Sequence, residues 1–268
     1  MAACCWALPA AALLTRPDRD DAEYLELATR YTSSVPLNAP AGGEGVLIAS
    51  RWVLTAAHMA KTVGDIKPPP VIDSPSYSTP KPKAAIAIGP RYYEIEKVFI
   101  HPDWKQDGDD SDIALILLKT DVLDVKATPA YAGTDEEGKT VVIVGNGLTG
   151  RIGSKPQPKA DWDRKKRAGI NTIDRVGPIT LGIRIKTAEE ASDLQASAAP
   201  GDSGAPAFIE TPEGLFVAGI GYATEDNGDG IIGNAGDWET YARVSAFYSW
   251  IQGTMLAVAA EEAEKRLK

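Results

Sequence analysis

The 268-residue sequence has little histidine and little cysteine, and both shortages narrow the chemistry open to it. Its histidines are His58 and His101, and its cysteines are the adjacent Cys4 and Cys5. These four residues do not have the spacing of a zinc-binding set, so we expect no metal and no cofactor. Neighbouring cysteines rarely pair with each other, and neither could cross-link the body of the fold.

The chain also has fewer basic than acidic residues, 28 Lys and Arg against 37 Asp and Glu. The formal net charge is −9, and 24% charged with 44% hydrophobic residues is the composition of an ordinary globular protein. A negative chain is poorly suited to nucleic acid or an anionic membrane, so we expect neither as a partner. One basic cluster, residues 164–167, follows two aspartates and predicts a solvated loop.

The apolar N-terminal segment is too short to cross a membrane. Residues 1–14, MAACCWALPAAALL, are small and hydrophobic but lack a positively charged start. We interpret them as a signal segment, complete or truncated, and the alternative is a packed or disordered terminus. The first interpretation predicts a secreted or periplasmic protein.

From residue 33 onward the chain is a series of short apolar or alternating runs separated by turn-forming residues. GVLIA, RWVLTAA and DIALILL lie in a first block, and VVIVG, GAPAFIE and LFVAGIGYA lie in a second. This spacing favours antiparallel β structure over βαβ units. The proline-rich residues 67–83 predict an inserted surface loop.

Two helices are expected at the ends of this β-rich region. Residues 18–31 have helical spacing of apolar side chains and an aspartate at the N-cap. Residues 245–268 also have helical spacing, with Ser245 where an N-cap belongs.

Three short segments carry residues suited to nucleophilic chemistry by a hydroxyl. RWVLTAAH ends in His58, DIALILL begins with Asp112, and Ser203 lies in GDSGAP. A serine needs a base to remove its proton, and the base works best when an acid orients it. His101 precedes a proline in FIHPDW, and we expect it to have a structural or surface role.

The segments LTAAH, DIALILL and GDSGAP follow one another in the order His, Asp, Ser. In this the chain resembles the chymotrypsin/trypsin-like serine protease family over about residues 33–252. The α/β-hydrolase pattern does not fit, because Ala205 occupies its second glycine position and its order is Ser, acid, His.

The resemblance implies an all-β fold of two six-stranded antiparallel β-barrels with a C-terminal α-helix. The protease domain would span residues 15–252, after the signal-like residues 1–14. Its N-terminal barrel would cover about 33–120 and its C-terminal barrel about 138–244, followed by the helix at 245–268.

The resemblance also implies roles for individual residues. His58 would be the general base, Asp112 would orient it, and Ser203 would be the nucleophile. The N–H groups of Gly201 and Ser203 would form the oxyanion hole. A monomer would then hydrolyse peptide bonds of a protein or peptide substrate through an acyl-enzyme. The alternative is a non-catalytic binding module with the same fold.

The expected specificity pocket gives mixed signals. Its lining residues would be Ser197, Thr224 and Glu239. Serine at 197 suits an apolar or aromatic substrate side chain, whereas a buried Glu239 would favour a cation. The alternative for Glu239 is an outward orientation in a remodelled loop. The acidic stretch 225–237 lacks the glutamate that closes an EF-hand, so we expect a pocket-side loop there.

Two further departures from the family concern cysteine and activation. Met59 and Ala199 stand where the family commonly has cysteines, so no disulfide is expected in the body of the fold. The family's Ile-Val-Gly-Gly N-terminus, whose ammonium pairs with the aspartate before the nucleophile, is also missing. We therefore hypothesise that cleavage after Ala12 frees the Leu13 ammonium to pair with Asp202. The alternative is that a side chain or backbone N–H groups satisfy Asp202.

Overall fold

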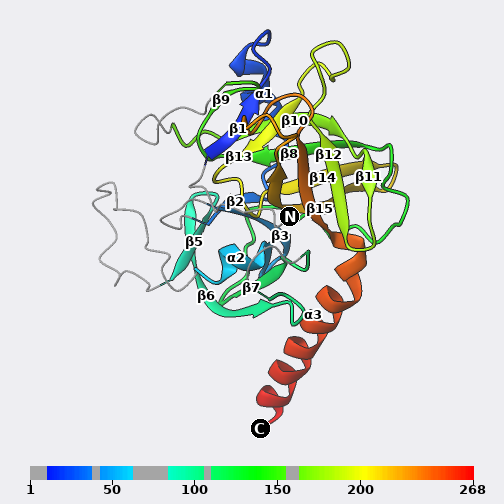
Figure 1. Ribbon diagram of the computed structural model, residues 1–268. Helices are drawn as coiled ribbons and strands as arrows, with labels where there is room; N and C mark the ends of the chain where they lie inside the picture. The colour runs from blue at the N-terminus through cyan, green and yellow to red at the C-terminus, as the bar shows by residue number, and fades with distance from the viewer. Residues whose placement is uncertain (1–10, 38–42, 63–83, 106–109, 155–162) are drawn as a thin grey trace, which may run out of the picture.

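The computed structural model describes residues 11–37, 43–62, 84–105, 110–154 and 163–268. Most of its strands belong to two barrel-like β sheets, which lie one above the other in Figure 1. No helix within these ranges is long and apolar enough to cross a membrane. The predicted surface loop at 67–83 and the two cysteines lie outside the described residues.

The first sheet is formed by the N-terminal half of the chain. Its strand order is β2-β3-β4-β7-β6-β5, and every neighbouring pair is antiparallel. The edge strands β2 and β5 lie close to each other, so the sheet curls toward a closed barrel. The bounds are β2 (Ser34–Pro36), β3 (Glu44–Ala49), β4 (Trp52–Thr55), β5 (Ala85–Ile88), β6 (Arg91–Ile100) and β7 (Ala114–Leu118).

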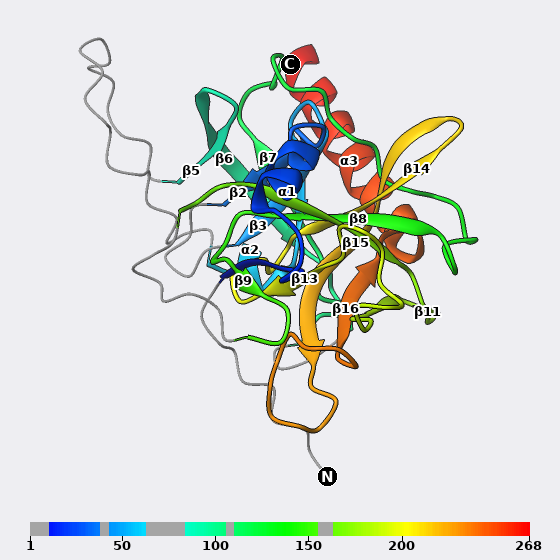
Figure 2. The ribbon, with the colours of Figure 1, turned by 90° about the horizontal axis from the view of Figure 1, so that it is seen from above.

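The second sheet follows with the order β10-β8-β14-β15-β16-β12-β11, again antiparallel throughout. It has seven strands among the described residues rather than the six expected, because the two-residue β11 extends its edge. Residues 226–237, between β15 and β16, project away from both sheets (Figure 2). The bounds are β8 (Thr140–Gly145), β10 (Arg167–Thr172), β11 (Arg175–Val176), β12 (Thr180–Arg184), β14 (Pro206–Thr211), β15 (Gly214–Glu225) and β16 (Trp238–Arg243).

A third, three-stranded sheet includes the start of the described chain. Strand β1 (Ala11–Thr15) pairs antiparallel with β13 (Ala196–Ala199) and parallel with β9 (Gly150–Arg151). Leu13 and Leu14 are 0% and 1% exposed. Residues 11–14, which the sequence assigns to a signal-like segment, thus form part of the folded body in this structure.

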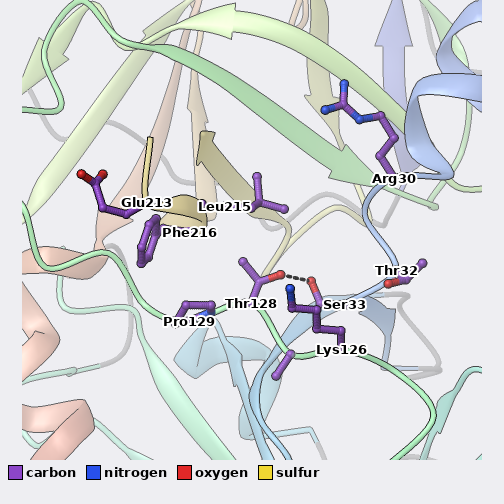
Figure 3. Close-up of a pocket in the computed structure, with 11 residues that line it drawn as sticks. Arg30, Thr32, Ser33, Lys126, Thr128, Pro129, Glu213, Leu215 and Phe216 are labelled. Carbon is purple, nitrogen blue, oxygen red and sulfur yellow. Dashed lines mark hydrogen bonds between the residues drawn. The ribbon is translucent and has the colours of Figure 1, made fainter. Parts of the chain in front are cut away.

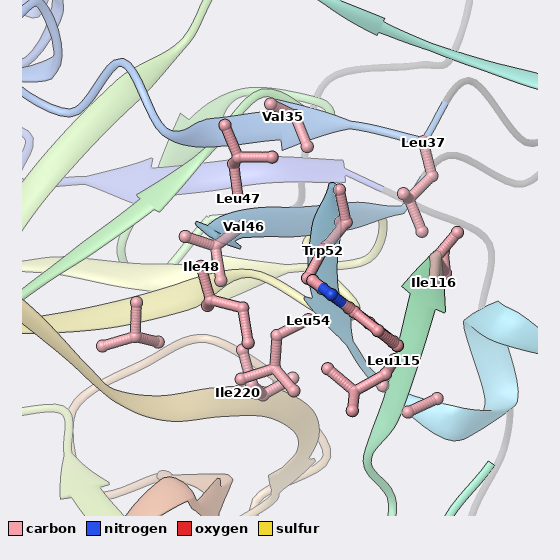
Figure 4. Packing of buried hydrophobic residues seen from close by; sticks show 14 of the residues in the cluster. Val35, Leu37, Val46, Leu47, Ile48, Trp52, Leu54, Leu115, Ile116 and Ile220 are labelled. Carbon is pink, nitrogen blue, oxygen red and sulfur yellow. The ribbon is translucent and has the colours of Figure 1, made fainter. Parts of the chain in front are cut away.

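One hydrophobic core joins the two large sheets. Trp52 and Leu54 of β4 and Leu115 of β7 lie in the same buried cluster as Ile220 of β15 (Figure 4). All five residues of β7 are buried, which is why the DIALILL run is continuously apolar rather than alternating. Because β7 is held in the core, the position of Asp112, two residues before this strand, is fixed as well.

The described part of the chain contains the helices α1 (Asp21–Ala28), α2 (Ala57–Ala60) and α3 (Val244–Leu267). The predicted capping of α1 is confirmed, because Asp20 accepts the N–H of Ala22 at 3.0 Å in a capping box with Glu23. The predicted N-cap of α3 is wrong. Strand β16 continues through Arg243, so the helix begins before Ser245, whose hydroxyl donates to Glu136 at 2.6 Å.

The helix α3 runs from the second sheet down beside the first (Figure 1). Its side chains Phe247 and Trp250 contact the ring of His101 edge-on, at centroid distances of 4.9 and 5.0 Å. Near the other end of the helix, Arg51, in the turn between β3 and β4, donates to Glu262 at 2.9 Å. The structural role expected of His101 agrees with this packing.

The prediction of a solvated loop at 164–167 holds for Arg164 and Lys165, which are exposed, but is wrong for Lys166 and Arg167. The Arg167 side chain is 2% exposed and donates to the carboxylates of Asp21 and Asp163, each at 2.7 Å. The Lys166 ammonium donates to two main-chain carbonyls, those of Tyr31 and Ser34. These two cations attach α1 and the segment after it to the second sheet. Most of their partners are more than 130 positions away, so the sequence around the cluster does not reveal them.

Candidate active site

The first sheet brings His58 and Asp112 together. Thr55, at the end of β4, pairs with Ala114 at the start of β7, and the two candidate residues lie just beyond that pair. The His58 Nδ1 and Asp112 Oδ2 atoms are 2.6 Å apart, and the His58 backbone N–H donates to Asp112 Oδ1 at 2.9 Å. The Asp112 side chain is 9% exposed and the imidazole 35%. A buried acid therefore holds His58 by two bonds, one to the ring Nδ1 and one to the backbone N–H, and leaves Nε2 unengaged by Asp112.

The loop that carries Ser203 attaches to the same end of the first sheet. The Ser203 carbonyl accepts the N–H of Glu44 at 2.8 Å. Gly204 has a φ of +85°, and a Cβ there would lie 2.1 Å from the Glu44 carbonyl oxygen and 2.4 Å from Thr55 Oγ1. Only glycine fits such a contact, as expected for the residue that follows the candidate nucleophile Ser203. The structure thus brings the three segments LTAAH, DIALILL and GDSGAP to one place.

The turn at 201–203 leaves two N–H groups available. Gly201 has a φ of +111°, which glycine alone adopts readily. In the described part of the chain, neither the Gly201 nor the Ser203 N–H has a hydrogen-bond acceptor. Within the described residues, the Ser203 hydroxyl makes no hydrogen bond to the His58 ring. In ligand-free sites such bonds are often long.

Asp202, next to the nucleophile candidate, is held by backbone N–H groups. Its side chain accepts from Ala199 at 3.0 Å and from Gly147 at 3.4 Å, and the residue is 2% exposed. Burial raises the pKa of Asp202 well above its usual range, and the two N–H bonds offset part of that effect. A Cβ on Gly145 would lie 2.0 Å from Asp202 Oδ1, so the carboxyl fills this space tightly.

Glu239 points inward, and the alternative in which it turns outward is wrong. It is 1% exposed, and its carboxylate accepts the N–H of Ala198 and, at 2.9 Å, the hydroxyl of Tyr241. Burial raises the pKa of Glu239 to about 7, against hydrogen bonds that lower it. The carboxyl therefore titrates in the neutral range.

The other two pocket candidates lie beside Glu239. Thr224 is its cross-strand neighbour in the β15–β16 pair and is half-buried. Ser197, in β13, is fully buried, and its hydroxyl donates to the Ala198 carbonyl at 3.0 Å. All three candidates thus gather where β13 meets the second sheet.

The acidic stretch 225–237 forms a loop tied down by its own carboxylates. Asp237 is fully buried and accepts the N–H groups of Asn227, Gly233 and Asn234. Across the described ranges, no group of three or more His, Cys, Asp or Glu side chains is arranged to hold a metal ion. The aspartates of this loop accept backbone N–H groups and so stabilise the loop conformation.

A separate pocket of about 370 Å³ contains none of the candidate residues. Figure 3 shows its lining, which comes from residues 30–33, 126–129 and 213–216. A hydrogen bond of 2.7 Å between Ser33 and Thr128 lies at the pocket. This pocket is therefore separate from the site around His58.

Sequence reasoning missed Glu44. This residue of β3 is 0% exposed, it bonds the serine loop through its backbone, and its carboxylate accepts the N–H of Asn146 at 3.1 Å. The available signal was its position between glycines, directly before the apolar run VLIA. A charged residue there resembles a turn residue, and nothing local indicates that it is buried.

Comparison with known families and proteins agrees with this geometry. Residues 27–251 match the family described as Trypsin. The chain is 37% identical to the complement C1s-1 subcomponent of Mus musculus over 102 residues, which is 35% of this chain and 14% of that protein. It is 27% identical to the serine protease Hayan of Drosophila melanogaster over 237 residues, 78% of this chain and 34% of that protein.

The chain therefore spans about a third or less of the length of these relatives. The family match, in contrast, covers most of the chain and both large sheets. The chain belongs to the trypsin family of serine proteases.

Proposed function

We propose that the protein is a serine endopeptidase that cleaves protein or peptide substrates through an acyl-enzyme. The observation that carries this proposal is the 2.6 Å contact between His58 Nδ1 and Asp112, next to the loop that presents Ser203. His58 takes the proton of Ser203 as the hydroxyl attacks the scissile carbonyl, and then gives it to the leaving amine. Asp112 stabilises the imidazolium formed between these steps.

The oxyanion of the tetrahedral intermediate is bound by the N–H groups of Gly201 and Ser203. Their lack of acceptors in the described residues supports this role, because free donors need no rearrangement when the charge develops. Water then hydrolyses the acyl-enzyme with His58 again as base. We further propose that the enzyme acts as a secreted or periplasmic monomer without cofactors.

Labelling with a fluorophosphonate tests this function, because only an activated serine reacts with it. The wild-type protein is expected to be labelled at Ser203, and Ser203→Ala is expected to be unlabelled. A folded wild-type protein that resists the reagent would instead favour the non-catalytic binding module.

Glu239 is proposed to select substrates with a basic side chain before the scissile bond. Glu239→Gln is expected to lower kcat/KM for Lys and Arg substrates about 100-fold, because leaving a buried charge without its partner costs about 3 kcal/mol. Cleavage after aromatic residues should change little. Profiling on a peptide library measures both, with the exposed Glu137→Gln as the matched control. A wild-type enzyme that never cleaves after basic residues would contradict this role.

This selectivity is expected to depend on pH. Since the pKa of Glu239 is raised to about 7, its carboxyl is neutral in acid and charged above that pH. The ratio of kcat/KM for Lys over Phe substrates should fall about tenfold per pH unit below 7. Using a ratio removes the shared titration of the catalytic groups. The same ratio in Glu239→Gln should be flat, and a matching slope there would assign the effect to another group.

A further inference from the structure

Glu44 of β3 connects the loop that carries Ser203 to the first sheet through backbone hydrogen bonds. Its N–H donates to the Ser203 carbonyl at 2.8 Å, and its own carbonyl accepts the Thr55 hydroxyl at 2.6 Å. Gly204 lies directly against the same carbonyl. The backbone of Glu44 therefore cannot move without moving Ser203 or Gly204.

The side chain of Glu44 is not fully satisfied. Its Oε1 accepts the N–H of Asn146 at 3.1 Å, but its buried Oε2 has no hydrogen-bond partner in the described structure. The next N–H along the chain, that of Gly147, donates to the carboxylate of Asp202. Two buried carboxyl groups thus bind consecutive amides of one turn. If both were ionised, each would be desolvated and would repel the other.

The nearby cations do not neutralise this pair. Lys166 faces Glu44, but its ammonium donates to main-chain carbonyls, and the described residues show no ion pair between the two. Asp202 faces Arg167, whose guanidinium is bound to other carboxylates, and also faces Glu239, which adds negative potential. The electrostatic cost therefore falls on the carboxyl groups themselves.

We propose that Glu44 carries a proton while the serine loop holds this conformation, and that this neutral Glu44 positions Ser203. A neutral acid loses far less hydration on burial than a carboxylate does. The proton falls on Glu44 rather than on Asp202, because Asp202 accepts two N–H groups whereas Glu44 accepts one and has a buried Oε2 without a partner. The role is one of positioning, because Glu44 acts through the backbone of Ser203 and Gly204.

The titration of Glu44 sets the sign of the pH dependence. Burial first, and the charge of Asp202 second, raise the pKa of Glu44 well above its usual range, while Lys166 and the Asn146 N–H lower it less. Because the folded-state pKa exceeds the unfolded one, the contribution of Glu44 to stability is present in acid and lost as pH rises through the folded value. Ionisation draws Oε2 toward water and loosens the strand that holds Ser203.

Glu44→Gln tests this inference, because glutamine keeps the shape and stays neutral at every pH. The melting temperature of this variant should exceed that of the wild type by an amount that grows with pH, while Glu137→Gln should track the wild type. Carbon-13 NMR should show the Glu44 carboxyl of the wild type staying protonated to higher pH than the carboxyl of the exposed Glu137. A Glu44 carboxyl that ionises together with Glu137, or a melting-temperature difference that is constant with pH, would overturn the inference.

The positioning role rests on the proposed function and has its own readout. The rate of fluorophosphonate labelling at Ser203 should fall in the wild type as Glu44 ionises, about tenfold per pH unit above its pKa, and Glu44→Gln should not show this fall. If Glu44→Gln were labelled at least tenfold more slowly than the wild type at pH 7, the charged form of Glu44 would be the one that positions Ser203, which would overturn this role. If the wild type is not labelled at any pH, the proposed function fails, while NMR and melting still decide the state of Glu44.

Discussion

Replacing Ser203 with alanine is expected to lower amide hydrolysis by about 10⁴- to 10⁶-fold, because the attacking atom is removed. His58→Ala should have an effect of similar size, since without a base the hydroxyl keeps its proton. The double substitution should be little worse than either single one, because the two residues act as one unit. Steady-state hydrolysis of a peptide amide measures all three.

Two controls separate loss of chemistry from loss of structure. Ser154→Ala removes an exposed hydroxyl outside the site and should keep full activity. His101→Phe keeps a ring against Phe247 and Trp250 and should also remain active, because this histidine packs against α3. Undiminished hydrolysis by Ser203→Ala would end the serine-protease proposal. Loss in Ser203→Ala but not in His58→Ala would require another base.

The sequence predicts the parts of this site that are encoded locally. The apolar run after Asp112 and the small residues before His58 indicate strand ends, and the resemblance gives their order. The glycine after Ser203 indicates a tight contact, which the structure shows against Glu44 and Thr55. These features are readable because each depends on residues next to it in the chain.

Features that depend on distant partners could not be predicted. Arg167 looks solvated within its basic cluster, but its partner Asp21 lies 146 positions away. Glu44 looks like a turn residue, and its partner Asn146 is 102 positions away. Burial of a charge is decided by such contacts, so composition and local spacing give no sign of it. The inward orientation of Glu239 depends on such contacts as well, since it bonds the N–H of Ala198, 41 positions away.

Cleavage after Ala12 is hypothesised to raise activity, because an ionised Asp202 paired with an ammonium would hold the turn at 201–203 more firmly than two backbone N–H groups do in the intact chain. In the intact chain, Ala11 of β1 lies opposite Ala199, whose N–H donates to Asp202. Leu13 follows on the same strand and is fully buried. A new ammonium at Leu13 would therefore begin on the strand that pairs with β13, whose Ala199 N–H binds Asp202. Pairing with it would favour the ionised form and fix the turn at 201–203.

The intact and cleaved proteins distinguish this hypothesis from its alternative. Backbone N–H groups already bind Asp202 in the intact chain, so the alternative expects no gain from cleavage. N-terminal sequencing of the active protein should identify Leu13, and a chain made uncleavable by replacing Ala10 and Ala12 with leucine should label slowly. Asp202→Asn should abolish the gain, because an amide cannot pair with an ammonium. Full activity with residues 1–12 attached would refute the hypothesis. A neutral Glu44 fits the same scheme, since one ammonium then meets one carboxylate.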